Sequence, residues 1–318
     1  MTTATAAQPR LNRRQFFQQF GLLIVFLILC LVLAVVDDGF LTWDNLLNVL
    51  RQATINGIIA VGVMFVILTR GIDLSVGSVL AMATIVCASL LENGWNPVLA
   101  LVVCLLVGAV LGLITGVLVS FLRIPSFIAT LGMMTFGRGL AFTITDGQPI
   151  TGFDEAFRWI GTSSAFGIIP TPIIIMGIVC LIAYFLLNHT TLGRYIFALG
   201  SNERAAYVSG LPNRLVLLSV YALSGVMAAL SGAILMARLN SAQPSIGQGF
   251  ELDAIAAVVV GGTTFEGGEG TLFGTILGVL IIAVINNALN LLNVPAEFVG
   301  VVKGVVIVVA LLLHRALR

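Results

Sequence analysis

Three short segments of this chain carry the polar residues whose types and spacing could do chemistry. The first reads Gly71-Ile72-Asp73-Leu74-Ser75-Val76-Gly77-Ser78, the second runs from Ser201 to Pro212, and the third is the asparagine trio Asn286, Asn287 and Asn290. Carboxylates, hydroxyls and amides of this kind can cap helices or contact a polar solute, but they supply no nucleophile–base pair and no cluster of metal ligands. The two histidines, His189 and His314, are far apart in the sequence. We therefore expect no catalytic residue and no metal site.

The first segment has a structural and a functional interpretation. Asp73 comes directly before an apolar run, where the dipole of a helix favours a negative charge and free N–H groups need a cap. Ionisable residues at membrane boundaries also gate or couple movements. The residues to which we assign this structural or gating role are Gly71, Asp73, Ser75 and Gly77.

The second segment predicts a short polar helix. Ser201 or Asn202 can cap its start, Glu203 falls in its first turn, and Gly210 is suited to the position just after its end. The small pair Ala205-Ala206 favours close approach by a partner, so we expect a docking helix; a plain interfacial helix is the alternative. The docking segment comprises Asn202, Glu203, Arg204, Ala205, Ala206 and Gly210.

The asparagine trio lies within an apolar run. Asn286 and Asn290 share one helical face, with Asn287 beside them. Buried amides must be satisfied either by a neighbouring helix or by water and a polar solute in a pathway. Both interpretations stay open, and the three residues are our candidates for lining a path.

The sequence excludes the common phosphate-binding loop. That loop needs a lysine followed by a serine or threonine, whereas the single lysine of this chain, Lys303, is followed by Gly304. The glycine-rich stretch Gly261–Gly270 lacks the G-x-G-x-x-G pattern and carries two glutamates, which would repel phosphate. We interpret it as a tight turn, and we expect no cofactor bound by this chain.

Composition places these segments in a membrane. The 318 residues are 59% hydrophobic and only 9% charged, with a mean hydropathy of +1.11, against about 25% charged residues in a typical soluble domain. A soluble enzyme is therefore excluded, and a net charge of +1 gives no field that would attract nucleic acid. The class that fits is an all-α, polytopic membrane protein.

Nine apolar runs approach the length of about 20 residues that a membrane crossing needs. They are Phe20–Val36, Leu46–Thr69, Leu74–Leu91, Val98–Leu122, Ser126–Thr145, Ile173–Leu187, Leu215–Ala237, Thr271–Leu292 and Phe298–His314. The run Leu252–Gly262 is about half that length, and counting it as a short element gives about ten crossings. An N-terminus inside places ten of the fifteen lysines and arginines on the cytoplasmic side, so both termini are predicted to be cytoplasmic.

We expect one domain over residues 1–318, with a cytoplasmic tail at 1–19 and a cytoplasmic loop at 188–214. The longest outer loop is Asp146–Thr171, and neither long loop can build a core of its own. The four cysteines lie in apolar runs and are interpreted as packing residues.

Two stretches of the chain echo each other. Gly71-Ile72-Asp73-Leu74 resembles Gly249-Phe250-Glu251-Leu252, and Gly108–Gly112 resembles Gly274–Gly278. If the copies are crossings two to five and seven to ten, one crossing separates them and the second copy is inverted, as in alternating-access pathways. The alternative is that the Gly-x-x-x-Gly pattern recurs for helix packing alone.

Together these residues resemble the permease subunit of ribose-type ABC sugar importers. The resemblance rests on Gly71–Ser78, on Asn202-Glu203 followed by Ala205-Ala206 and Gly210, and on Glu251–Ala257 leading into Gly261-Gly262-Thr263, and it covers nearly the whole chain from about Phe40. One departure is that Arg204 stands before the two alanines, where the general permease loop has an acid.

The resemblance implies a single transmembrane permease domain of a bacterial inner membrane, with a fold similar to vitamin B12-type importers and ten helices. It implies that a monosaccharide, ribose or a related sugar, passes from periplasm to cytoplasm. The implied partners are a cytosolic ATPase that holds ATP and Mg, a periplasmic sugar-binding protein, a second permease copy and membrane lipid. Residues 188–214 would be the coupling loop, moved when the ATPases close. The alternative is an ion-coupled secondary carrier, for which Asp73, Glu251 and Asp253 are the candidate carboxylates.

Overall fold

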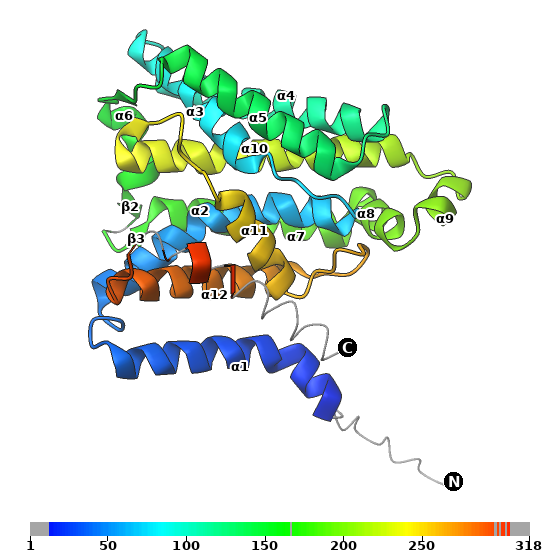
Figure 1. Cartoon of the computed structure of the whole chain (residues 1–318), viewed down its shortest axis with the longest axis horizontal. Helices are drawn as coiled ribbons and strands as arrows, with labels where there is room; N and C mark the ends of the chain where they lie inside the picture. Colours follow the sequence, from blue (N-terminus) through cyan, green and yellow to red (C-terminus); the bar gives the residue numbers. More distant parts are fainter. Residues whose placement is uncertain (1–12, 166, 296–297, 299, 303, 306–318) are drawn as a thin grey trace, which may run out of the picture.

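Apolar runs become long helices in the computed structural model, which describes residues 13–165, 167–295, 298, 300–302 and 304–305. The long helices are α1 (Arg13–Val36), α2 (Trp43–Leu68), α3 (Val76–Glu92), α4 (Pro97–Ser120), α5 (Ser126–Thr145), α7 (Thr171–His189), α10 (Asn213–Leu239) and α12 (Leu272–Leu291). They lie side by side along one common direction (Figure 1). The chain is thus an all-α, polytopic protein.

The predicted crossings agree closely with these helices. Six of them (α2, α4, α5, α7, α10 and α12) are long and apolar enough to cross a membrane, while α3 and the apolar part of α1, Gly21–Val36, are shorter. The short element predicted at Leu252–Gly262 is α11 (Phe250–Val260). The run Phe298–His314 lies mostly outside the described residues, and helix α1 begins at Arg13, inside the predicted tail.

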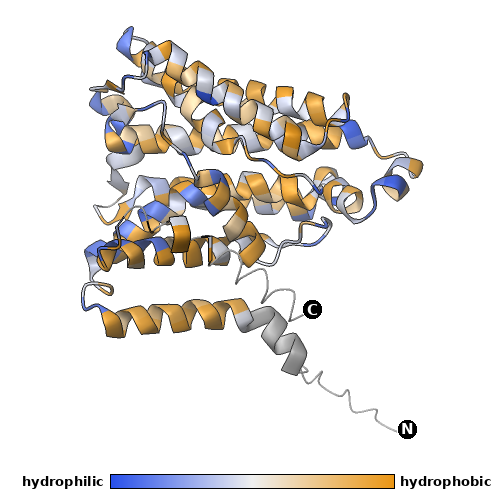
Figure 2. Cartoon of the chain, viewed as in Figure 1, coloured by the Kyte–Doolittle hydropathy of each residue, from blue (hydrophilic) through white to orange (hydrophobic). Residues whose placement is uncertain are grey.

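Helix α2 forms the centre of the bundle. Every residue from Ala53 to Leu68 is buried, and the helix packs against α7, α10, α11 and α12. A helix that is apolar on all sides is stable only inside a structure or within lipid. Apolar residues also cover the outer surface (Figure 2), for example Val35 at 80% exposure and Leu181 at 69%. This outer layer is what a lipid-facing surface requires.

Helices α4 and α10 approach each other through glycines. A Cβ at Gly108 would collide with the carbonyl group of Gly225, and one at Gly112 would collide with the carbonyl group of Tyr221. In the second copy of the pattern, a Cβ at Gly278 would collide in the same way with the carbonyl group of Ala257 in α11, and one at Gly274 with that of Gly261 directly after α11. Close helix packing therefore accounts for the Gly-x-x-x-Gly pattern in both copies.

The two ends of the bundle differ. One end, here called the α9 end, carries α8 (Thr191–Ser201) and α9 (Glu203–Val208); the opposite end, the α6 end, carries α6 (Glu155–Thr162) and short strands (Figure 1). Strand β1 (Ile150–Thr151) pairs antiparallel with β4 (Ser241–Ala242), with Ile150 opposite Ala242, and β2 (Ser164–Ala165) pairs with β3 (Ile169–Pro170). The predicted loops at 188–214 and Asp146–Thr171 thus both have ordered structure.

Candidate functional site

The carboxylate of Asp73 is buried and fully engaged between two helices. Its Oδ1 atom accepts hydrogen bonds from the backbone N–H of Ser75, at 2.9 Å, and from the hydroxyl of Ser75, at 2.6 Å. Its Oδ2 atom accepts one from the hydroxyl of Ser224 in α10, at 2.7 Å. Helix α3 begins at the next residue after Ser75. Asp73 therefore fixes the turn directly before α3 and ties it to α10, but it accepts no hydrogen bond from within α3, whose N-cap residue is Ser75; both its capping and its gating role stay predictions.

The two glycines of this segment lie where neighbouring atoms leave no room for a side chain. A Cβ at Gly71 would come within 2.6 Å of the hydroxyl oxygen of Tyr221. A Cβ at Gly77 would collide with the carbonyl oxygen of Gly247. The spacing of glycines in Gly71–Ser78 is therefore set by contacts with α10 and with the segment that leads into α11.

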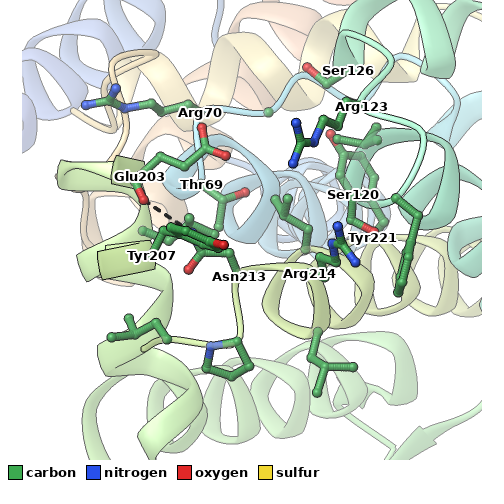
Figure 3. A pocket seen from close by; sticks show the side chains of 18 of the residues that line it. Thr69, Arg70, Ser120, Arg123, Ser126, Glu203, Tyr207, Asn213, Arg214 and Tyr221 are labelled. Atoms are coloured by element: carbon green, nitrogen blue, oxygen red, sulfur yellow. Dashed lines mark hydrogen bonds between the residues drawn. The ribbon is translucent and has the colours of Figure 1, made fainter. Parts of the chain in front are cut away.

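The predicted polar helix is α9, and Asn202 rather than Ser201 caps it. The side chain of Asn202 accepts a hydrogen bond from the N–H of Ala205 at 2.9 Å, whereas the hydroxyl of Ser201 donates to a carbonyl within α8. Gly210 follows the helix with φ +80°, the left-handed conformation expected at this position. The carbonyl of Glu203 accepts a hydrogen bond from Asn213 (Figure 3).

One detail of the predicted docking surface is wrong. Ala206 is 4% exposed and packs into the bundle, whereas Ala205 is exposed. The surface of α9 is instead completed by Tyr207 and Val208, which are 74% and 79% exposed. Large apolar side chains exposed at a polar helix are typical of a protein contact.

Arg70 joins the Asp73 segment to this docking region. Its Nε atom donates to the carbonyl oxygen of Gly200 at 2.6 Å, and its Nη2 atom donates to that of Ser201 at 2.8 Å. Both carbonyls lie at the end of α8, directly before α9. The glycine-rich loop Gly261–Gly270 also contacts this region, because the N–H of Gly268 donates to the carbonyl oxygen of Leu68, two residues before Arg70, at 2.9 Å. This group of contacts, here called the Arg70 clasp, holds three loops together at the α9 end.

A second arginine makes a similar contact in the middle of α5. The Nη1 atom of Arg138 donates to the carbonyl oxygens of Pro244 and Ile246, both at 2.7 Å. The segment after β4 is thus fixed to α5 and, through Gly247, to α3.

Two of the three asparagines contact neighbouring helices. Asn287 and Asn45 exchange two hydrogen bonds, of 2.7 and 3.0 Å, and the amide of Asn286 lies 3.4 Å from the carboxylate of Asp253. Asn290 is exposed. The first two therefore have the partners expected from the packing interpretation, and a path-lining role stays a prediction for all three.

The glycine-rich stretch Gly261–Gly270 forms a loop between α11 and α12, as predicted. Gly262, Gly267 and Gly268 all have positive φ. Within the described residues, no group of three His, Cys, Asp or Glu side chains could hold a metal ion.

Comparison with known proteins identifies the family. A family model described as "Branched-chain amino acid transport system / permease component" matches residues 45–311. The chain belongs to this permease family.

Individual relatives of the permease are sugar importers. It is 46% identical to the ribose import permease protein RbsC of Escherichia coli K12 over 99% of each chain, and 46% identical to the RbsC protein of Bacillus subtilis over 97% of this chain and 96% of the relative. It is 40% identical to the D-allose transport system permease protein AlsC of Escherichia coli K12, over 96% of this chain and 94% of the relative. No solved structure matches the permease.

Sequence reasoning missed three features of the permease site. The sequence pattern assigns no contact to Arg70 or Arg138; the one local signal is the position of Arg70 directly before the Gly71 motif. The exposed pair Tyr207 and Val208 lies outside the predicted docking residues. The partners of the two arginines do not follow from local pattern, since they lie in segments far away in the sequence.

Proposed function

We infer that the chain is the transmembrane permease subunit of an ABC importer that moves a monosaccharide, ribose or a related sugar, into the cell. Likeness over the full length to permeases named for ribose, allose and galactose import supports this function. The structural observation that carries it is the Arg70 clasp, because it joins the end of α8, directly before the exposed docking helix, to the segment that positions Asp73.

The permease itself supplies movement and no covalent chemistry. A separate cytosolic ATPase holds ATP and Mg and contacts α9 through Tyr207 and Val208. When the ATPases close, α9 and the end of α8 move, and Arg70 transmits the movement to Gly71 and Asp73. Asp73 then shifts α10 through Ser224, since the hydrogen bond between them is buried.

A second permease copy completes the path. Helix α5 exposes the small or polar residues Gly132, Thr135, Gly139 and Thr143 beside apolar side chains such as Ile128 and Phe136. The outer faces of α4 and α7 expose leucine, valine and isoleucine instead, as lipid contact demands. Small or polar residues are better suited to a sugar path between two copies, and the exposed Asn290 is a further candidate for that path. The path binds sugar weakly, and a periplasmic sugar-binding protein supplies affinity.

The arrangement proposed for the membrane follows from the sequence. Both termini lie on the cytoplasmic side of a bacterial inner membrane, with the α9 end inside. Ten helices form one domain over residues 1–318, with an inverted repeat and a fold similar to vitamin B12-type importers. Many transporters contain discontinuous transmembrane helices that line the substrate cavity, and the short helix α11 is proposed to be one of them.

Reconstitution tests the proposed function. Vesicles should contain the permease, with its ATPase on one side of the membrane and its binding protein on the other. They should transport labelled ribose, or a monosaccharide that competes with it, only when ATP is present on the side of the ATPase. An ATPase variant unable to hydrolyse ATP is the control. Accumulation driven by a proton or sodium gradient without the ATPase would instead support a secondary carrier, and uptake of leucine but no sugar would support an amino acid importer.

A further inference from the structure

A cavity of about 1200 Å³ lies at the α9 end, between α9, the α4–α5 connection and the start of α10. Four arginines line it, namely Arg70, Arg123, Arg204 and Arg214, and Glu203 is the one carboxylate among its described lining residues. Figure 3 shows the guanidinium groups of Arg123 and Arg214 directed into the same space, with Glu203 on the other side. The cavity wall therefore has an excess of positive charge concentrated around one arginine pair.

Neither arginine of this pair is placed to stabilise its own local structure. Arg214 is the second residue of α10, where the helix dipole disfavours a positive charge. Arg123 has φ +56°, a left-handed conformation that is rare for such a side chain. The guanidinium carbon of Arg214 lies 5.1 Å from the ring centre of Phe121, and this cation–π contact holds the group in the cavity.

A buried hydroxyl group lies at the same place without a partner. Ser120, the last residue of α4, is 6% exposed and lines the cavity. Its Oγ atom has no hydrogen-bond partner in the described part of the chain. A buried hydroxyl group is normally satisfied, and two converging guanidinium groups beside it form a donor set for an oxygen-rich anion.

The rim of the cavity indicates the source of the anion. Phe121 and Leu215 line it and are 46% and 60% exposed, and Leu122 beside them is 63% exposed. Basic pockets of this kind, next to apolar surface on the cytoplasmic side of membrane helices, bind phospholipid headgroups. We propose that this cavity binds the phosphate group of an anionic phospholipid, with Arg123, Arg214 and Ser120 as donors and with acyl chains along Phe121 and Leu215. This site does not depend on the proposed sugar transport, but it rests on the proposed orientation with the α9 end inside.

Lipid retention by the purified full-length permease tests the site. The wild type, delipidated in detergent and mixed with equal amounts of phosphatidylglycerol and phosphatidylcholine, should retain phosphatidylglycerol preferentially in native mass spectrometry. The double variant Arg123→Asn, Arg214→Gln should lose at least about tenfold in that preference, which corresponds to about 1.4 kcal/mol. Asparagine is chosen at 123 because it tolerates positive φ.

Arg194→Gln is the matched control, because Arg194 is an exposed arginine of α8 that does not line the cavity. It should retain lipid like the wild type. If the double variant fails to fold, as judged by its thermal transition, Ser120→Ala should still weaken retention. Equal retention by wild type and variants would overturn the site, and binding of inorganic phosphate in equilibrium dialysis without any preference between the two lipids would overturn the lipid assignment.

Discussion

The side-chain Nε atom of Arg70 and the carbonyl oxygen of Gly200 lie 2.6 Å apart although 130 residues separate them in the chain. Arg70 directly precedes the Gly71-Ile72-Asp73 segment, and Gly200 lies two residues before the cap of α9. The residue directly before the segment expected to gate is therefore bound to the end of α8, directly before the segment expected to dock. Movement of α9 that carries the end of α8 with it would therefore act on Arg70 through this hydrogen bond.

The link between Asp73 and Ser224 should contribute to both stability and transport. Removing the carboxylate in Asp73→Ala leaves the hydroxyl groups of Ser75 and Ser224 without a buried acceptor, which costs about 1–3 kcal/mol for each unsatisfied group. We expect a clearly lowered unfolding temperature in detergent. The Asp73→Asn variant keeps the shape of the side chain and one acceptor oxygen, so its unfolding temperature should be higher than that of Asp73→Ala.

Comparison of these variants separates the two roles of Asp73. If the carboxylate gates, Asp73→Asn should lose ATP-driven uptake while keeping a near-normal unfolding temperature. If uptake instead follows stability across Asp73→Asn, Asp73→Ala and Ser224→Ala, the carboxylate has only a structural role.

Gly210 should be required for coupling and not for the membrane fold. It has φ +80° and open space around it, so Gly210→Val strains the backbone without a collision, at about 1–2 kcal/mol. The end of α9 should then be displaced, and sugar should no longer stimulate the ATPase. Gly210→Asn, which tolerates this φ, should retain stimulation. Normal sugar-stimulated turnover in Gly210→Val would count against α9 as the docking helix.

The glycine contact between α4 and α10 should be intolerant of larger side chains. Gly112→Leu would push a side chain into the backbone of Tyr221 and separate the helices, so we expect loss of folded protein in size-exclusion profiles. Gly177→Leu in α7 is the matched control, since no atom lies within 4 Å of a Cβ at Gly177. Equal loss in both variants would argue against a specific role of this contact.

Topology can be read from one exposed position. A cysteine introduced by Ser201→Cys should react with a membrane-impermeant maleimide only in inside-out vesicles, because Ser201 is exposed at the α9 end and that end is predicted to be cytoplasmic. A cysteine-free background removes the four native thiols. Reaction in right-side-out vesicles would reverse the predicted orientation.

The helices could be predicted from sequence because the apolar runs are long and their ends carry local signals. The 20-residue run Ser126–Thr145 is helix α5 with the same bounds, and the cap and left-handed glycine of α9 follow from short-range chemistry. Ala206 was wrongly predicted to be exposed, because a helix of six residues is too short for the sequence pattern to define its buried side.

Contacts between distant segments could not be predicted in the same way. Arg70 and Arg138 bind backbone carbonyl groups, and carbonyls are present at every residue, so no partner can be recognised from side-chain types. The pairing of Asn287 with Asn45 was likewise one of several possible outcomes for a buried amide. These contacts depend on how the helices are arranged.

The number of sugar molecules transported per ATP hydrolysed, measured for Arg70→Gln in vesicles with the ATPase and the binding protein, tests the central claim most directly. Glutamine cannot make both hydrogen bonds to Gly200 and Ser201, and hydrogen bonds from charged donors contribute about 1.5–3 kcal/mol each. We predict that the ratio falls at least about tenfold while ATP hydrolysis continues, and that Arg194→Gln keeps the wild-type ratio. An unchanged ratio in a folded Arg70→Gln permease would contradict transmission through the Arg70 clasp.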